Sequence, residues 1–185
     1  NLKPYNLLKK FFIIFKIKYI KNINRMSKMS DIKVAVLIVD DKKFMRDTVK
    51  DYVENNQNRN VGGIEFDFEI TTVDNGEEAI LSYARDKHEI VIMDLSMDEI
   101  DGLTATKEIL EINPKAKIIG MASEGDSNVE EFKVSGIKYF LEKPFQETYI
   151  NSKIDILVKE IFAEKSLEEL DVKKKKKSIW KKLMS

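Results

Sequence analysis

The sequence has 185 residues, no cysteine and a single histidine, and its formal net charge is zero. That zero hides three differently charged parts: residues 1–30 carry eight basic and no acidic residues, residues 172–185 carry seven lysines and no acid, and residues 31–171 hold all 32 acids with 17 of the 32 basic residues. Without cysteine there are no disulfides or thiolate metal sites, and the lone His88 argues against zinc sites and Ser-His-Asp triads.

Residues 1–30 differ in composition from the rest of the chain. The apolar stretch Leu7–Ile20 is interrupted by four lysines, so it is too short and too charged for a membrane-spanning helix, and it lacks the features of a secretory signal. Two interpretations stay open. The segment is either a basic amphipathic helix lying on an anionic membrane, or translated upstream sequence that is not native, with Met26 or Met29 as the start. We favour the second, and analyse the fold from Asp31.

From Asp31 onward the chain alternates five times between strand-like and helix-like segments. The predicted strands are Val34–Val39, Phe66–Val73, Ile90–Met93, Lys117–Met121 and Tyr139–Leu141. The predicted helices are Lys42–Asn55, Glu77–Arg85, Leu103–Ile112, Asn128–Val134 (with Ser127 as N-cap and Gly136 closing it) and Gln146 to about Phe162. Residues 55–63, rich in asparagine and glycine, are predicted as a loop. This alternation predicts an α/β fold: a flavodoxin-like, doubly wound, five-stranded parallel sheet with helices on both faces.

Carboxylates follow two of the most apolar predicted strands. Asp40 and Asp41 end the first strand, and Asp94 ends the third. Parallel strands deliver their carboxyl ends to one edge of the sheet, where open α/β sheets bind ligands. Acids gathered there repel one another unless a cation lies between them. Mg²⁺, which prefers oxygen ligands, suits such a cluster, and the backbone carbonyl of Ser96 is a candidate further ligand. The alternative is that Asp41 simply caps the helix that begins at Lys42.

These residues belong to a longer pattern that resembles a known family. The segments Ile38-Val39-Asp40-Asp41, Met93-Asp94 with Asp101-Gly102, and Lys143-Pro144-Phe145 resemble the receiver domain of bacterial two-component response regulators, over about residues 32–162. The resemblance implies that Asp94 is the phosphoacceptor, forming an acyl phosphate. It implies that Lys143 pairs with Asp94 at rest and with the phosphoryl group afterwards, and that the bond before Pro144 is cis.

Three positions depart from the family pattern. Where the family has Thr or Ser followed by Ala, this chain has Ala122-Ser123, which displaces the switch hydroxyl by one residue. Because successive strand side chains point to opposite faces, Ser123 is not expected to reach a phosphoryl group, and the switch should weaken more than the chemistry. Phe140 occupies the switch aromatic position, where Tyr is frequent. Asp98 replaces the frequent proline after the phosphoacceptor.

The resemblance implies a phosphoacceptor response regulator that takes a phosphoryl group from a histidine kinase onto Asp94 and signals by a conformational switch. It resembles stand-alone, chemotaxis-regulator-like receivers: residues 31–163 form the receiver, and too few residues follow to bury an output domain. We expect a cytoplasmic protein with Mg²⁺ as cofactor, and no enzyme activity beyond its own phosphotransfer and dephosphorylation. A downstream protein is expected to bind the face of helix four, strand five and helix five, about residues 128–162.

Residues 164–185 are expected to form a charged helical or disordered basic tail. One interpretation is a solvated helix extension followed by a disordered tail. The other is a segment that docks on a membrane or an acidic partner, with Trp180 between lysine clusters as its anchor. Nucleic acid is not expected, because no second aromatic residue or basic face accompanies Trp180.

Two rival functions come from other classes. The replacement of the switch hydroxyl by Ala122 is compatible with a phosphorylation-independent scaffold that has a receiver fold. The acid cluster is compatible with a magnesium-dependent phosphohydrolase that uses an aspartyl nucleophile. That enzyme class needs a second acid two residues after the nucleophile, and here Ser96 occupies the position.

Overall fold

The fold is that of a computed structural model. The structure describes residues 32–55, 59–61, 64–98, 100–126, 129–135, 137 and 139–183. The basic N-terminal segment and the predicted caps Ser127 and Gly136 lie outside these residues.

The core of the protein is one sheet with strand order β2-β3-β1-β4-β5-β6. Five of these strands pair in parallel, and their order corresponds to 2-1-3-4-5 among themselves, which confirms the predicted flavodoxin-like fold. The strands are β1 (Lys33–Val39), β2 (Arg59–Val61), β3 (Ile64–Val73), β4 (Ile90–Asp94), β5 (Ile118–Ser123) and β6 (Tyr139–Lys143).

A sixth strand, β2, was not predicted. It lies within residues 55–63, which the sequence indicated as a loop, and it pairs antiparallel with the start of β3 at the edge of the sheet. Three residues carry too little hydrophobic pattern to be recognised as a strand. The pairing depends on the neighbouring β3, whose ten residues extend beyond the part that pairs with β1.

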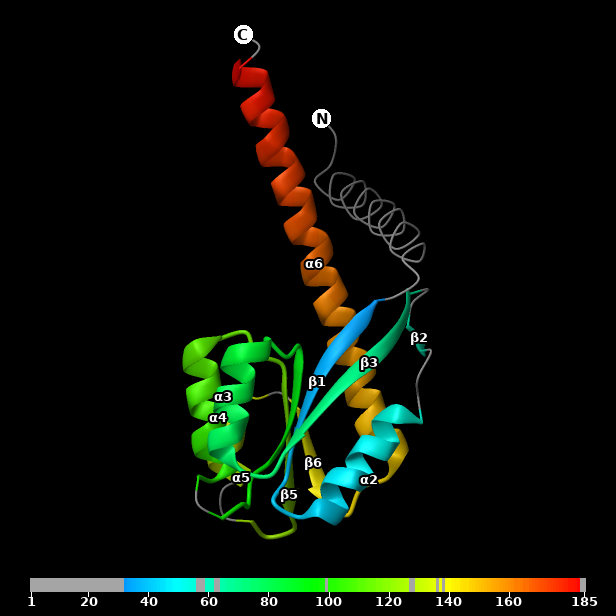
Figure 1. Cartoon of the computed structure of the whole chain (residues 1–185), viewed down its shortest axis with the longest axis vertical. Coiled ribbons are helices and arrows are strands. Elements are labelled where there is room, and N and C mark those ends of the chain that lie inside the picture. The colour runs from blue at the N-terminus through cyan, green and yellow to red at the C-terminus, as the bar shows by residue number, and fades with distance from the viewer. Residues whose placement is uncertain are drawn as a thin grey trace, which may run out of the picture.

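Helices cover both faces of the sheet, as Figure 1 shows. They are α2 (Lys43–Glu54), α3 (Gly76–Asp86), α4 (Gly102–Ile112), α5 (Val129–Val134) and α6 (Glu147–Leu183). Residues of α2 and α6 form one hydrophobic cluster with the sheet, and residues of α3 and α4 form a second cluster on the opposite face. Successive residues of β1 belong alternately to the two clusters: Ile38 lies in the first, and Leu37 and Val39 lie in the second. This strand is therefore apolar from Val34 to Val39, as expected for a strand buried on both faces.

Helix α6 does not end where its packed part ends. Phe162 is buried against the sheet, but the helix continues to Leu183, about 30 Å further at 1.5 Å per residue. Glu164 accepts from Lys117 at 2.9 Å just before β5, and Lys165 pairs with Glu89 just before β4. The helix beyond these pairs projects from the amino edge of the sheet, at the top of Figure 1. Among the residues that the structure describes, no helix is both long and apolar enough to cross a bilayer.

The single histidine is part of the packing. His88 follows α3 and is only 5% exposed, and its Nε2 atom lies 3.0 Å from Ser82 Oγ. Burial lowers the pKa of His88, because the protonated ring would lose its hydration there. The expectation that His88 has no catalytic or metal-binding role stays a prediction.

Candidate functional site

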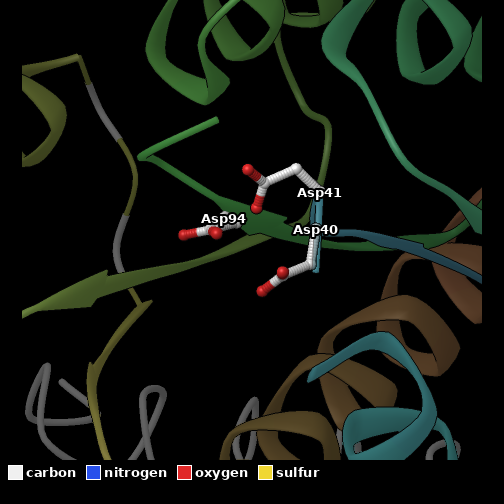
Figure 2. Close-up of side chains that lie close together, drawn as sticks. All are labelled: Asp40, Asp41 and Asp94. Carbon is white, nitrogen blue, oxygen red and sulfur yellow. The ribbon is translucent and has the colours of Figure 1, made fainter. Parts of the chain in front are cut away.

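Three aspartates converge at the carboxyl edge of the sheet. In the register of β1 and β4, Val39 lies opposite Met93, so the next residues along the two strands, Asp40 and Asp94, are neighbours. One carboxylate oxygen from each of Asp40, Asp41 and Asp94 lies within 4.8 Å of the others. Figure 2 shows the three side chains leaving adjacent strand ends towards a common region.

Lys143 brings a cation to this cluster from the end of β6. Its Nζ atom lies 2.8 Å from Asp40 Oδ2 and 2.9 Å from Asp94 Oδ2. The peptide bond from Lys143 to Pro144 is cis, as the resemblance implied. The structure thus gathers four residues that the sequence had placed at three separate strand ends.

The cluster is buried, and this determines its electrostatics. Asp40 is fully buried and Asp94 is 1% exposed. Burial is the largest influence on Asp94, and it raises the pKa of this carboxyl to about 6. The nearby Lys143 ammonium acts in the opposite direction, while the charge of Asp40 adds to the increase. At neutral pH the protein therefore holds Asp94 ionised against a desolvation penalty that Lys143 only partly offsets.

Backbone and side-chain contacts hold the first two aspartates in place. The backbone N–H of Lys42 donates to Asp40 Oδ1 at 2.9 Å, and Arg46 Nη1 donates to the Asp40 carbonyl oxygen at 2.6 Å. Lys42 Nζ lies 3.1 Å from Asp41 Oδ1. The N-cap of α2 is Lys42 itself, without a side-chain cap hydrogen bond, so the alternative that Asp41 caps this helix is wrong. The sequence analysis missed Arg46, whose only signal was its place one turn into the helix after the acids.

The start of α4 packs directly against the end of β4. A Cβ atom on Gly102 would lie 1.8 Å from the carbonyl oxygen of Asp94, so no larger residue fits without moving the backbone. Asp101 is the N-cap of α4, and its side chain accepts from Thr104 N–H at 2.7 Å. The sequence marked Asp101-Gly102 as part of a motif, but the close backbone approach that requires glycine appears only in the structure.

Ser96 connects the loop after β4 to the loop after β5. Its N–H donates to Asp94 Oδ1 at 3.4 Å, and its hydroxyl donates to Asp126. This places the Ser96 backbone beside the carboxylate cluster. Its role as a metal ligand through the carbonyl oxygen stays a prediction. Asp126 was not among the predicted site residues.

The predicted switch residues lie on β5 and β6. Ala122 is fully buried in the cluster that faces α3 and α4, and the half-buried Phe140 packs against the same cluster. Ser123 is exposed at the end of β5, opposite Lys143 in the strand register. The methyl group of Ala122 therefore occupies the inward position, and the hydroxyl of Ser123 is one residue further along.

The donor set of this site fits Mg²⁺. It offers carboxylate oxygens from three residues, a set suited to a hard divalent cation. The pKa of Asp94 is raised mainly by burial, with a smaller contribution from the charge of Asp40, so Lys143 alone does not offset the cost of keeping this carboxylate ionised. Asp40, Asp41 and Asp94 would hold the ion, and the metal would offset their mutual repulsion.

Comparisons with known proteins agree on one family. The family model described as "Response regulator receiver domain" matches residues 36–155. The chain is 41% identical over 116 residues to "Chemotaxis protein CheY" of Thermotoga maritima, covering 62% of this chain and 89% of that protein. It is 38% identical over 112 residues to the protein of the same name from Bacillus subtilis, covering 60% and 86%.

Solved structures give the same result for the fold. One chain of the crystal structure of a CheX–CheY–BeF3–Mg complex from Borrelia burgdorferi is 25% identical, with a TM-score of 0.56, and the match covers 65% of this chain and 86% of that one. A signal receiver domain from Vibrio parahaemolyticus, at 21% identity, matches with a TM-score of 0.60 over 75% of this chain and 97% of that one.

Proposed function

The chain belongs to the response regulator receiver domain family, whose members are phosphoacceptor signalling domains rather than classical enzymes, and from this premise we propose that Asp94 accepts a phosphoryl group from the phosphohistidine of a histidine kinase. One observation carries the proposal: the carboxylates of Asp40, Asp41 and Asp94 meet at the edge where Lys143 contacts two of them.

Asp94 is the nucleophile of the proposed transfer. A carboxylate oxygen of Asp94 forms a bond to phosphorus, while the bond from phosphorus to the imidazole nitrogen of the donor breaks. The departing imidazole nitrogen keeps the electron pair of the broken bond. The donor leaves as neutral imidazole if its other ring nitrogen carries a proton, and otherwise takes up a proton as it leaves. The product is an acyl phosphate on Asp94. Burial of the carboxyl favours this reaction, because the strand end presents it in a place where few waters compete.

The other residues bind and orient. Receiver domains bind Mg²⁺ at an acidic pocket, and here Asp40, Asp41 and Asp94, with the Ser96 carbonyl, are proposed to hold it. The ion, when bound, supplies positive charge that stabilises the phosphoryl oxygens. Lys143 supplies a second positive charge as a mobile ammonium, moving from the carboxylates to the phosphoryl group. The backbone N–H of Lys42 keeps Asp40 in position throughout.

The readout is proposed to pass through β5 and β6 to the surface formed by α5, β6 and the first part of α6, residues 129–162. Ala122 lacks the hydroxyl that would bond a phosphoryl oxygen, a contact to an anion worth about 1.5–3 kcal/mol. Phosphoryl transfer to Asp94 does not depend on this hydroxyl and proceeds without it. The effect of phosphorylation on Phe140 and on the partner surface is weak, because the hydrogen bond that would link them to the phosphoryl group is missing. A downstream protein that binds this surface would give a chemotaxis-like, single-domain regulator, in line with the names of the similar proteins.

The buried methyl of Ala122 also favours a second candidate, a receiver-fold scaffold that works without phosphorylation. The phosphohydrolase alternative has no such support, because the position two residues after Asp94 carries Ser96, whose hydroxyl donates to Asp126.

The decisive experiment is the intact mass of the full chain after incubation with acetyl phosphate and Mg²⁺. We expect a gain of one phosphoryl group that is absent in Asp94→Asn and absent when Mg²⁺ is removed by a chelator. Asp98→Asn is the matched control, because Asp98 is an exposed acid in the same loop, and this variant should still be labelled. No gain in the wild-type chain favours the scaffold, and sustained release of phosphate from the free donor favours the hydrolase.

A further inference from the structure

The described part of the chain begins, and α6 leaves the receiver, at the same edge of the sheet. The sheet begins with β1 at Lys33, and α6 passes the starts of β5 and β4 at Glu164 and Lys165 before it projects outward. This amino edge is opposite the carboxyl edge that holds the aspartate cluster. The chain thus enters and leaves the domain on the side away from its phosphoacceptor site.

The segments attached at this edge are strongly basic. Residues 1–30 carry eight basic residues and residues 172–185 carry seven lysines, with no acid in either. All the acidic residues lie in the intervening part of the chain. The basic end of α6 and the acidic body of the receiver therefore carry opposite charge, which favours an approach of the α6 end to an anionic surface.

The arrangement of the lysines indicates what kind of surface fits. Lys173–Lys177 are five consecutive positions of the α6 backbone, and because successive positions of a helix are about 100° apart, the five positions go round the helix axis. A groove on a folded partner contacts one side of a helix, so it would leave several of these charges unpaired. An extended anionic surface accepts them all, because long lysine side chains bend towards it while their stems stay close to apolar material.

Apolar residues follow the same helix. The sequence spacing of Val172, Ile179 and Leu183, by seven and four residues, is typical of positions on one side of a helix, and Trp180 is next to Ile179 in the sequence. Val172 is 51% exposed. An apolar stripe with a tryptophan, flanked by lysines, is the composition of helices that lie in the headgroup region of a bilayer. A nucleic acid backbone offers nothing for that stripe, so lipid is the better fit.

We propose that the basic end of α6, residues 172–183, docks the protein on an anionic lipid surface. The lysines lie among the headgroups, and the stripe with Trp180 enters the interface. Because the aspartate cluster is at the edge opposite to the one where α6 leaves the receiver, docking of the α6 end does not cover the phosphoacceptor site. This docking is independent of the proposed phosphotransfer.

The test uses the full chain and two vesicle types: phosphatidylcholine alone, and phosphatidylcholine with about a third phosphatidylglycerol. Trp180 is the only tryptophan, so its fluorescence reports on the tail without labelling. We expect co-sedimentation and a blue shift of the emission with the anionic vesicles only. Raising the salt from about 0.1 M to about 1 M shortens the screening length from about 10 Å to about 3 Å and should release most of the protein.

Variants distinguish vesicle binding by the tail from binding through lysines elsewhere on the protein. Replacing Lys173–Lys177 by glutamine should weaken partitioning into anionic vesicles by about 100-fold or more, and Trp180→Ala by about tenfold, measured by sedimentation. The matched control replaces five lysines of the domain body by glutamine and should bind within about threefold of wild type. These control positions are Lys43, Lys50, Lys107, Lys115 and Lys159.

Two results would overturn the docking proposal: equal partitioning of the wild-type chain and the tail variant, or tighter binding to a DNA duplex than to anionic vesicles at the same salt. Asp94→Asn should bind vesicles like the wild-type chain. Failure of phosphorylation and failure of docking are therefore separate outcomes.

Discussion

Two half-buried lysines at opposite edges of the sheet have very different surroundings. Lys143 at the carboxyl edge and Lys117 at the amino edge have nearly the same side-chain exposure, 14% and 13%. Lys143 faces Asp40 and Asp94, whose side chains are 0% and 2% exposed, whereas Lys117 faces Glu164, which is 50% exposed. A buried carboxylate needs a nearby cation to stabilise its negative charge, whereas water stabilises the charge of a half-exposed carboxylate even without one. A change of charge at the carboxyl edge should therefore alter the stability of the fold. At the amino edge, the Lys117–Glu164 pair mainly holds α6 against the domain.

The largest effect is expected where backbone packing builds the carboxyl edge. Gly102→Ala places a methyl group against the carbonyl oxygen of Asp94 and should lower the free energy of unfolding by about 3 kcal/mol or more. Urea unfolding monitored by circular dichroism measures this. Gly125→Ala is the control: Gly125 has φ +78° and open space around it, so only backbone strain of about 1 kcal/mol is expected. Equal losses in the two variants would contradict a steric role for Gly102.

The two lysines provide the most direct test of the comparison. Lys143→Met should lower the free energy of unfolding by about 2–3 kcal/mol at neutral pH without metal. This loss of stability is at or below the usual range for breaking a buried ion pair, because Asp94 can take up a proton and so avoid being a buried charge without a partner. Lys117→Met should lower it by less than about 1 kcal/mol. In the same unfolding assay, millimolar Mg²⁺ should narrow the difference between Lys143→Met and the wild type, and should leave the difference between Lys117→Met and the wild type unchanged. Equal losses would mean that the two edges do not differ as described.

Removing the strained charge should stabilise the metal-free protein. The pKa of Asp94 is raised from 3.8 to about 6 by burial, so the folded chain binds this proton more tightly than the unfolded chain. The wild type therefore loses stability as the pH rises from about 4 to about 6. Asp94→Asn avoids this loss and should be more stable by about 1–3 kcal/mol above pH 7, with the difference vanishing near pH 4.

Thermal unfolding at a series of pH values measures that difference. Mg²⁺ should raise the stability of the wild type but not of Asp94→Asn. A difference between the two proteins that stayed constant from pH 4 to pH 8 would assign the effect to packing instead of charge.

The smallest expected effect concerns the switch position. Ala122→Ser restores a hydroxyl at the buried end of β5, where it should bond a phosphoryl oxygen. We expect about tenfold tighter binding of beryllofluoride with Mg²⁺, measured by calorimetry, because a hydrogen bond to an anion is worth about 1.5–3 kcal/mol before the desolvation of the hydroxyl is subtracted. Ser123→Ala is the control and should leave the affinity unchanged, since Ser123 is exposed. Weaker binding by Ser123→Ala would show that the displaced hydroxyl serves the site after all.

Much of the carboxyl edge could be predicted because it depends on local patterns. Apolar runs that end in Asp40 and Asp94 indicate buried parallel strands, and parallel strands bring their carboxyl ends together whatever the details of packing. Helix positions followed from apolar periodicity in the same way. The short strand β2 escaped prediction, because its pairing depends on a neighbour and its own pattern is too short.

The sequence by itself determined the alternation of strands and helices, the strand ends that carry the acids, and the separation of basic ends from an acidic body. Each of these depends on residues close together in the chain. The tertiary structure decided which groups touch: the contact of Lys143 with two carboxylates, the burial that raises the pKa of Asp94, the approach of Gly102 to the end of β4, and the exit of α6 at the amino edge. These depend on distances and exclusion of water between segments far apart in the chain, which no local pattern specifies.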